Sequence, residues 1–319
     1  MYKRKISFIS QRIEPNWITG MCDRSGSFSI IVSKRKSGSW EIRPVFELLV
    51  NEKYFEILNK VQSFFNKGSI YKLKKSNNII FRINKIKDIN DVVIPHFKLY
   101  PLLSTKKVNY LLWLKCVELI NLGKNKSYNE KYKLLSIYAS IGRGPSKKVV
   151  ADFPELISIE KPTYIKPSLD DLSEWWISGY FSIYCNFNVD MNPHGFKESI
   201  YHRVVPSFNF SRNIKESFLI ELLASYFDVN FNLRSNNLRI DVNVYGLQKL
   251  ESIIHLFNNF PLSSCKQKEF IIWAEIVNKL LLLSNIPKDY RLSLDSHIPL
   301  FIELTNKLIK VRNLNNSKL

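Results

Sequence analysis

The sequence predicts an α+β protein made of two similar units, each in the order α-β-β-α-β-β-α-α. Its 319 residues exceed the length of most single hydrophobic cores. Four segments recur in the same order at a shift of roughly 160 residues, which indicates a duplicated domain. Between stretches of helical periodicity, apolar and polar residues alternate with period two, so each unit is expected to contain both helices and strands.

Each unit opens with a short helix that is followed directly by a strand. Trp17 to Gly20 in the first unit matches Trp176 to Gly179 in the second. We expect these helices to end near Gly26 and near Cys185. The segment Ser27 to Lys36 predicts the strand of the first unit, because Phe, Ile and Val alternate there with Ser. One face of this strand is therefore expected to be buried.

A second strand and an amphipathic helix come next in both units. The second strand is expected around 42–50 in the first unit, and around 204–210 in the second, where apolar residues alternate with Ser and Asn. The helix is predicted within segments 51–66 and 213–228, which resemble each other and end in two aromatic residues and a polar one. The pattern is typical of a helix that packs on one face of a sheet.

A hairpin and two helices complete each unit. Ser-Asn-Asn occurs at 76–78 and again at 235–237, each time between two strand-like runs. Because Asn tolerates positive φ, this tripeptide predicts the hairpin turn. The matching segments 101–120 and 261–280 then predict the closing helices, with Pro, Leu, Ser, Lys, Trp and Val in register.

The repeat predicts how the chain is divided. A segment with four Pro, Gly142 and Gly144 lies between the copies and has the composition of a linker. The residues before the first unit are basic and contain no acid. The expected parts are a basic N-terminal arm at 1–13, a first unit at 14–141, a linker at 142–170, and a second unit with a C-terminal helix and tail at 171–319.

The charge of the chain indicates a polyanionic partner. Lys and Arg total 47 against 28 Asp and Glu, which leaves a net charge of +19. Nucleic acid is the commonest partner of so basic a protein. The longest purely apolar runs are too short to span a bilayer, so no membrane role is expected.

The cysteines and histidines do not indicate a metal site. Cys22, Cys116, Cys185 and Cys265 are far apart, and no His lies at ligand spacing from any of them. Neither a zinc site nor a disulfide framework is expected. No Gly-rich phosphate loop and no nucleophile elbow occur, so the sequence predicts no cofactor.

The composition indicates an AT-rich genome. The chain contains 30 Asn and only 4 Ala. Asn, Lys, Ile, Phe and Tyr have AT-rich codons, whereas Ala and Gly have GC-rich ones. Organellar genomes are one AT-rich class, and we expect the protein in the mitochondrial matrix. An AT-rich nuclear or bacterial genome is the alternative.

The repeated helix carries a family resemblance. The segment Trp17 to Ile30, the Gly-Ser-Phe-Ser start of the next strand, the helix in 101–115 and the duplication together resemble the LAGLIDADG homing endonucleases and intron maturases. The resemblance covers nearly all of both copies. It implies that the two motif helices pack side by side at a pseudo-twofold axis through Thr19-Gly20 and Ser178-Gly179. It also implies two saddle-shaped antiparallel sheets that straddle nucleic acid.

The resemblance also implies which residues would perform catalysis. Family nucleases hold a divalent metal between two carboxylates, each one residue before the last motif position. Here these positions are Ser25 and Tyr184, and neither is an anionic ligand near neutral pH. Asp23 lies two residues earlier, and is expected to face elsewhere because two residues turn ~200° around a helix. We therefore predict degenerate motifs, no catalytic residue, no metal and no enzyme activity.

Basic residues on and beside the predicted strands are the candidate contacts to nucleic acid. Arg binds phosphate bidentately, and Ser and Asn at period two suit a polar sheet face. The candidates are Lys34, Arg35, Lys36, Arg43, Lys72, Lys74, Lys75, Arg82, Arg203, Arg212, Arg234 and Arg239.

These observations predict a protein that binds structured RNA without cutting it. The RNA is expected to be ribosomal, in a ribosome-associated protein within a large ribonucleoprotein, or a group I intron bound by a maturase. Two alternatives remain open: a regulator that binds duplex DNA, and an active DNA homing endonuclease with atypical residues. Sequence reasoning does not separate these partners.

Overall fold

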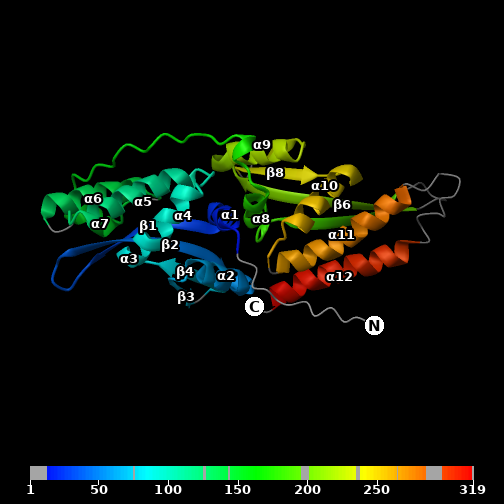
Figure 1. The fold of residues 1–319 in the computed structure, drawn as a ribbon, viewed down its shortest axis with the longest axis horizontal. Coiled ribbons are helices and arrows are strands. Elements are labelled where there is room, and N and C mark those ends of the chain that lie inside the picture. The colour runs from blue at the N-terminus through cyan, green and yellow to red at the C-terminus, as the bar shows by residue number, and fades with distance from the viewer. Residues whose placement is uncertain are drawn as a thin grey trace.

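A computed structural model describes residues 13–74, 76–124, 127–142, 144–194, 201–234, 238–263, 265–284 and 297–317. Figure 1 shows two α+β units placed end to end, with the helices α1 and α8 between them. The elements of the first unit are α1 (Pro15–Ser25), β1 (Gly26–Lys34), β2 (Trp40–Asn51), a 3-10 turn (Glu52–Tyr54), α2 (Phe55–Phe65), β3 (Ser69–Lys72), β4 (Asn78–Ile83), α3 (Ile86–Asp88), a π-helical turn (Ile89–Val93), α4 (Ile94–Leu99), α5 (Lys106–Asn121) and α6 (Tyr128–Ser140). A short helix, α7 (Lys147–Asp152), lies in the segment predicted to be the linker.

The second unit repeats this order. A 3-10 turn (Leu169–Asp171) precedes it. Its elements are α8 (Glu174–Phe181), β5 (Asn186–His194), β6 (Tyr201–Asn213), a 3-10 turn (Ile214–Glu216), α9 (Ser217–Tyr226), β7 (Phe231–Arg234), β8 (Arg239–Val244), α10 (Leu247–Asn259), α11 (Cys265–Ser284) and α12 (Ile298–Ser317).

Each unit contains one antiparallel sheet of four strands. The strand orders are β1-β2-β4-β3 and β5-β6-β8-β7, and every neighbouring pair is antiparallel. Both sheets therefore have the same topology, as a duplication requires. The predicted α+β fold with two pseudo-symmetric sheets is confirmed.

The helices cover one face of each sheet and bury its aromatic residues. In the first unit Phe28 packs on Trp113 of α5, with ring centroids 5.4 Å apart. In the second unit Phe187 packs on Trp273 of α11 at 5.1 Å. Because side chains alternate along a strand, the residues between these apolar positions lie on the other face. That uncovered face is called the outer face below.

Some local predictions differ from the structure. Helix α8 ends at Phe181, earlier than expected, because Ser182 turns back: its amide and hydroxyl bond to the Gly179 and Ser178 carbonyls. Strand β5 follows α8 as the repeat predicted, although its Asn-rich sequence has weak strand propensity. Apart from glycines, the described residues with positive φ are Asn66, Asp228 and Leu238. The predicted turn at 76–78 therefore forms without positive φ.

Several predicted segments lie wholly or partly outside the described residues. These include the basic arm, of which only residue 13 is described, and the second hairpin turn at 235–237. In Figure 1 the segment between α7 and α8 runs along one side of the molecule. Tyr164 from this segment donates a hydrogen bond to the Leu103 carbonyl at 2.5 Å. Within the described part, no helix is long and apolar enough to cross a membrane.

Candidate nucleic-acid interface

Two glycines set the contact between α1 and α8. A Cβ atom on Gly20 would lie 2.0 Å from the Trp176 carbonyl oxygen, and a Cβ on Gly179 would lie 2.0 Å from the Trp17 carbonyl oxygen. Both distances are far below van der Waals contact, so the backbones touch only because both residues are Gly. This approach brings the C-terminal ends of both motif helices together.

Asp23, the acid of the first motif helix, has a structural role as a hydrogen-bond acceptor. Its carboxylate accepts hydrogen bonds from the amides of Leu103 and Ser104 at 2.9 and 3.0 Å, and from the Trp176 indole at 2.8 Å. The side chain is fully buried, and burial raises the pKa of Asp23. At the matching position of the second unit, the Ser182 hydroxyl accepts from the Ser263 amide at 3.2 Å. Asp23 therefore joins the two units.

An arginine occupies the space between the helix ends. The Arg24 guanidinium lies over the Tyr184 ring, with its central carbon 4.4 Å from the ring centroid. Burial lowers the pKa of Arg24, and the positive charge of Arg212 acts in the same direction. Arg212 donates to the Arg24 carbonyl at 3.1 Å and so caps the end of α1. Ser25 beside it has a buried hydroxyl without a partner among the described contacts.

The helix ends border a cavity of about 350 Å³, which we call the central hollow. Both units contribute to its lining: Arg24, Asn51, Lys53, Tyr54, Ile183, Tyr184, Cys185, Asn186, Phe210, Ser211, Arg239 and Lys266. No carboxylate occurs among these described residues. The described chain also contains no group of three or more His, Cys, Asp or Glu residues that could hold a metal ion. The residues present do not fit the divalent metal that the resemblance implied.

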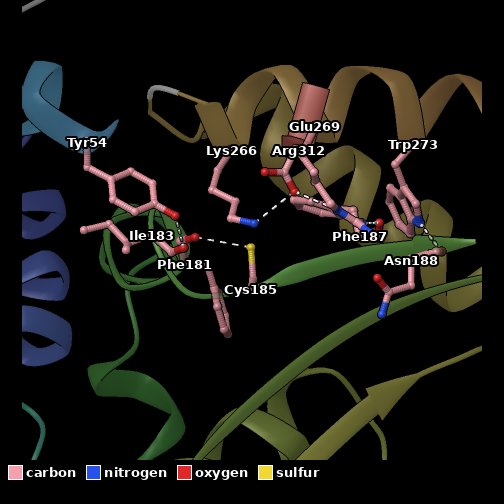
Figure 2. A network of polar contacts seen from close by, with 10 residues as sticks. All are labelled: Tyr54, Phe181, Ile183, Cys185, Phe187, Asn188, Lys266, Glu269, Trp273 and Arg312. Atoms are coloured by element: carbon pink, nitrogen blue, oxygen red, sulfur yellow. Dashed lines mark hydrogen bonds and ion pairs between the residues drawn. The ribbon is translucent and has the colours of Figure 1, made fainter. Parts of the chain in front are cut away.

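Figure 2 shows polar contacts of Lys266, Glu269 and Arg312, from α11 and α12, close to Cys185, which lines the hollow. Lys266 and Arg312 both pair with the buried Glu269, at 2.9 and 3.3 Å. From the first unit, the Tyr54 hydroxyl donates to the Ile183 carbonyl at 3.0 Å. The charge of Lys266 thus has a partner, whereas no acid lies next to Arg24 in the hollow lining.

Both outer faces carry rows of polar residues, although the outer face of the first sheet also contains apolar residues such as Leu49 and Ile80, which pair across β2 and β4. In the second sheet Asn186, Asn209 and Asn243 are in register across β5, β6 and β8. The corresponding row of the first sheet contains Ser27, Glu47, Arg82 and Ser69. Asn and Ser side chains both donate and accept hydrogen bonds, so these rows can contact base edges or phosphates.

Three of the predicted basic residues have side chains on these outer faces. Arg43 is exposed at the position that pairs with Ile31. Arg239 donates to the Ser211 hydroxyl at 2.6 Å and borders the central hollow. Arg82 forms a close ion pair with Glu47, so part of its charge is neutralised. Contact of these residues with nucleic acid stays a prediction.

Three other candidates lie on the side of the sheets that the helices cover, where each contacts another part of the chain, and their contact with nucleic acid stays a prediction. Lys34 pairs with Asp152 of α7 at 2.5 Å. Lys72 pairs with Glu52 at 2.8 Å, and Arg212 caps α1. The physical reason for this placement is that side chains alternate between the two faces of a strand. Lys34 lies on the same face as the buried Ile30 of its own strand, and Lys72 lies opposite the buried Ile79 of β4.

The remaining candidates lie at the ends of strands or are described only in part. Arg35 pairs with Glu41 at 2.8 Å, and Lys36 and Lys74 are exposed in turns. Lys75 lies outside the described residues. Arg203 and Arg234 are described by their backbone, at positions that pair with Asn192 and Arg239.

Sequence reasoning missed three of the cations that line the central hollow, Arg24, Lys53 and Lys266. The prediction depended on Ser25 and Tyr184 at the positions of the absent acids and did not include the cations around them. Arg24 directly precedes the Ser25 position, so a basic residue inside the motif was the available signal.

Comparison with known proteins identifies the family. Residues 18–117 and 177–277 each match the LAGLIDADG endonuclease family, one match in each unit. The chain belongs to this family. The predicted two-copy arrangement is therefore confirmed.

Similar proteins are named as endonucleases. Two curated relatives from Neurospora crassa, probable intron-encoded endonucleases 2 and 3, are 24% and 26% identical over 82% and 89% of this chain. The chain spans only 59% and 54% of their lengths. A solved structure, the I-LtrWI LAGLIDADG homing endonuclease bound to target DNA, is 27% identical with a TM-score of 0.80, over 92% of this chain and 97% of that one.

These comparisons correct the functional prediction. The prediction that the chain is not an enzyme is contradicted, because the relatives and the structural neighbour are named endonucleases. The expected RNA partner also gains no support, since the neighbour is bound to DNA. Ser25 and Tyr184 misled the prediction: it took two side chains as decisive for the activity of the whole protein.

Proposed function

We propose that the chain acts on duplex DNA as an intron-encoded endonuclease of the LAGLIDADG type with an atypical centre. The observation that carries the proposal is the placement of two sheets, each with a row of polar residues on its outer face, on either side of the α1–α8 contact. The neighbour that is bound to target DNA has the same fold. Each unit, 14–141 and 171–319, would then contact one half of a DNA target, with 142–170 as the linker.

Duplex DNA suits the outer faces better than structured RNA does. The major groove of DNA is about 12 Å wide, admits a two-stranded ribbon, and displays a distinct donor and acceptor pattern for each base pair. The major groove of an RNA helix is too narrow for side chains to read. Asn side chains in register across three strands provide the paired donors and acceptors that base edges require.

Strand cleavage would occur at the central hollow, where both motif helices end. Ser25 and Tyr184 stand where the resemblance implied carboxylates, so the described lining of the hollow offers no anionic ligand for a metal. We expect cleavage to be slow relative to a variant that has carboxylates at both positions. The proposed location is the mitochondrion, which the Asn-rich, Ala-poor composition and the intron-encoded relatives support.

Target selection from a random duplex library tests the proposal. The selected duplex should bind with a Kd of roughly 10⁻⁸ M or tighter, and at least ~10³-fold more tightly than random duplex at matched salt. The competitors are the same sequence as a single strand and a folded group I intron RNA. The selected duplex should then be assayed for strand cleavage. Tighter binding of the intron RNA would contradict the proposal.

A further inference from the structure

We propose that the central hollow binds a backbone phosphate directly, through Arg24, Lys53 and Arg239. This inference rests on the proposed function, since the phosphate would belong to the bound duplex. The hollow lies where the resemblance implied two carboxylates and a metal. Its charge is reversed, so its natural ligand is an anion and not a cation.

The lining of the hollow supplies the positive charge. Four of its residues are Lys or Arg, and no Asp or Glu is among the residues described there. Lys266 pairs with Glu269 behind the cavity wall, so its charge is largely compensated. Arg24 and Arg239 have no salt bridge to a carboxylate in the described structure. Neutral donors from Asn51, Asn186 and Ser211 complete the lining.

Arg24 is held in an orientation that suits phosphate. Its guanidinium lies over Tyr184 and at 5.4 Å from the Tyr180 ring centroid, so aromatic rings restrict its plane. The Nε atom is buried and has no hydrogen-bond partner among the described contacts. A guanidinium edge presents two parallel N–H donors, the geometry that matches two phosphate oxygens.

The surroundings of Arg24 leave its charge without a counter-ion. Asp23, the adjacent acid, is occupied by Leu103, Ser104 and Trp176. Arg212 places a second cation at the same helix end. Burying a cation without a partner is unfavourable, and a phosphate in the hollow would provide the missing negative charge.

Duplexes with single methylphosphonates test this inference, because each replaces one charged phosphate oxygen by a neutral methyl group. In the wild-type protein, a methylphosphonate at one or two positions near the centre of the duplex should weaken binding by roughly 10- to 100-fold. Arg24→Gln should weaken binding of the unmodified duplex to a similar extent, and the sensitive methylphosphonate should then cause little further loss. Arg239→Gln is the second variant: it changes an exposed side chain of the hollow, so it tests the binding of phosphate without disturbing the fold. Lys307→Gln, exposed on α12, is the control and should behave like the wild type.

The inference would be overturned if no central methylphosphonate weakened duplex binding. It would also be overturned if a methylphosphonate weakened binding only in Mg²⁺ and not in EDTA, because that result indicates a metal between the protein and the phosphate. If the wild type binds no duplex, the proposed function fails, and the binding of inorganic phosphate then tests the inference. Phosphate should raise the melting temperature above that in chloride at equal ionic strength, and should not do so in Arg24→Gln. Equal melting of the wild type in both salts would overturn the inference.

Discussion

At the scale of single residues, Ser25 and Tyr184 define the chemistry of the helix ends. The Ser25 hydroxyl is buried without a described partner, and Tyr184 is 45% exposed beneath the Arg24 guanidinium. Neither side chain supplies negative charge near neutral pH. Hard cations such as Mg²⁺ require oxygen ligands, with carboxylates as the usual protein contribution.

Carboxylates at both positions should therefore create a metal site. We expect Ser25→Asp combined with Tyr184→Asp to increase Mg²⁺-dependent cleavage of the selected duplex at least ~10-fold over the parent. The measurement is single-turnover cleavage on a labelled duplex, with and without EDTA. Ser25→Asn with Tyr184→Asn is the uncharged control. An equal rate in the Asp and Asn variants would contradict the prediction.

A buried histidine predicts a pH dependence of stability. His96 of α4 lies 3.1 Å from the Thr19 hydroxyl, which itself donates to the Tyr100 carbonyl, so neutral His96 donates through Nε2. Burial lowers the pKa of His96 from 6.5 to about 4. The unfolded chain binds a proton on this residue below pH 6.5 and the folded chain does not. Stability from His96 is thus present above pH 6.5 and is lost as the pH falls towards 4.

His96→Gln should remove this dependence while keeping an N–H donor. Between pH 7 and pH 4 the parent should lose roughly 3 kcal/mol more unfolding free energy than the variant does. Urea unfolding at a series of pH values measures the difference. His255→Gln, at an exposed position of α10, is the control. Parallel pH profiles for parent and His96→Gln would show that the ring does not titrate as described.

At the scale of elements, the α1–α8 contact holds the two units in their relative positions. Asp23 in α1 bonds to Trp176 in α8, and Arg212 in β6 caps α1, so polar contacts reinforce the glycine contact. The central hollow depends on this contact because both helix ends line it.

A single methyl group at the helix contact should separate the helices. Gly20→Ala or Gly179→Ala places a Cβ against a fixed backbone carbonyl, and overpacking of this kind costs ~1–3 kcal/mol or more. We expect lower melting temperatures and weaker duplex binding in both variants. Asn59→Ala, exposed on α2, controls for the substitution itself. Two variants with the stability and affinity of the parent would refute the close contact.

At the scale of the whole molecule, two outer faces and the central hollow form a surface that spans both units. Binding of a polyanion to such a surface releases counterions, so affinity should fall steeply with salt. Arg43 and Arg239 lie on this surface, whereas Lys34 is paired with Asp152 on the helix side. The fold therefore separates basic residues that the sequence groups together.

Alanine substitution should distinguish the two faces. Arg43→Ala and Arg239→Ala should each lower the slope of log K against log salt by ~0.9. Lys34→Ala, on the helix side of the first sheet, and Lys307→Ala, on α12, should leave the slope unchanged. The slope is measured by titration of the selected duplex at several salt concentrations. A larger change in the Lys variants than in the Arg variants would place the DNA on another surface.

The sequence by itself determined the duplication, the order of the elements, the family resemblance and the glycines of the motif helices. These properties are local or repetitive: alternation in a strand and the absence of a Cβ atom do not depend on distant partners. Strand β5 was predicted from the repeat and not from its own Asn-rich sequence, which has weak strand propensity and is stabilised by its pairing with β6.

Only the tertiary structure decided which charges lie together. Lys34, Lys72 and Arg212 looked equivalent to Arg43 and Arg239 in the sequence, yet strand parity and partners such as Asp152 direct them to the other side. The cationic hollow was equally inaccessible, since Arg24 and Arg239 are more than 200 residues apart and meet only through the α1–α8 contact. Charge is a property of residues, but a binding site is a property of their arrangement, and that arrangement depends on contacts between elements that are distant along the chain.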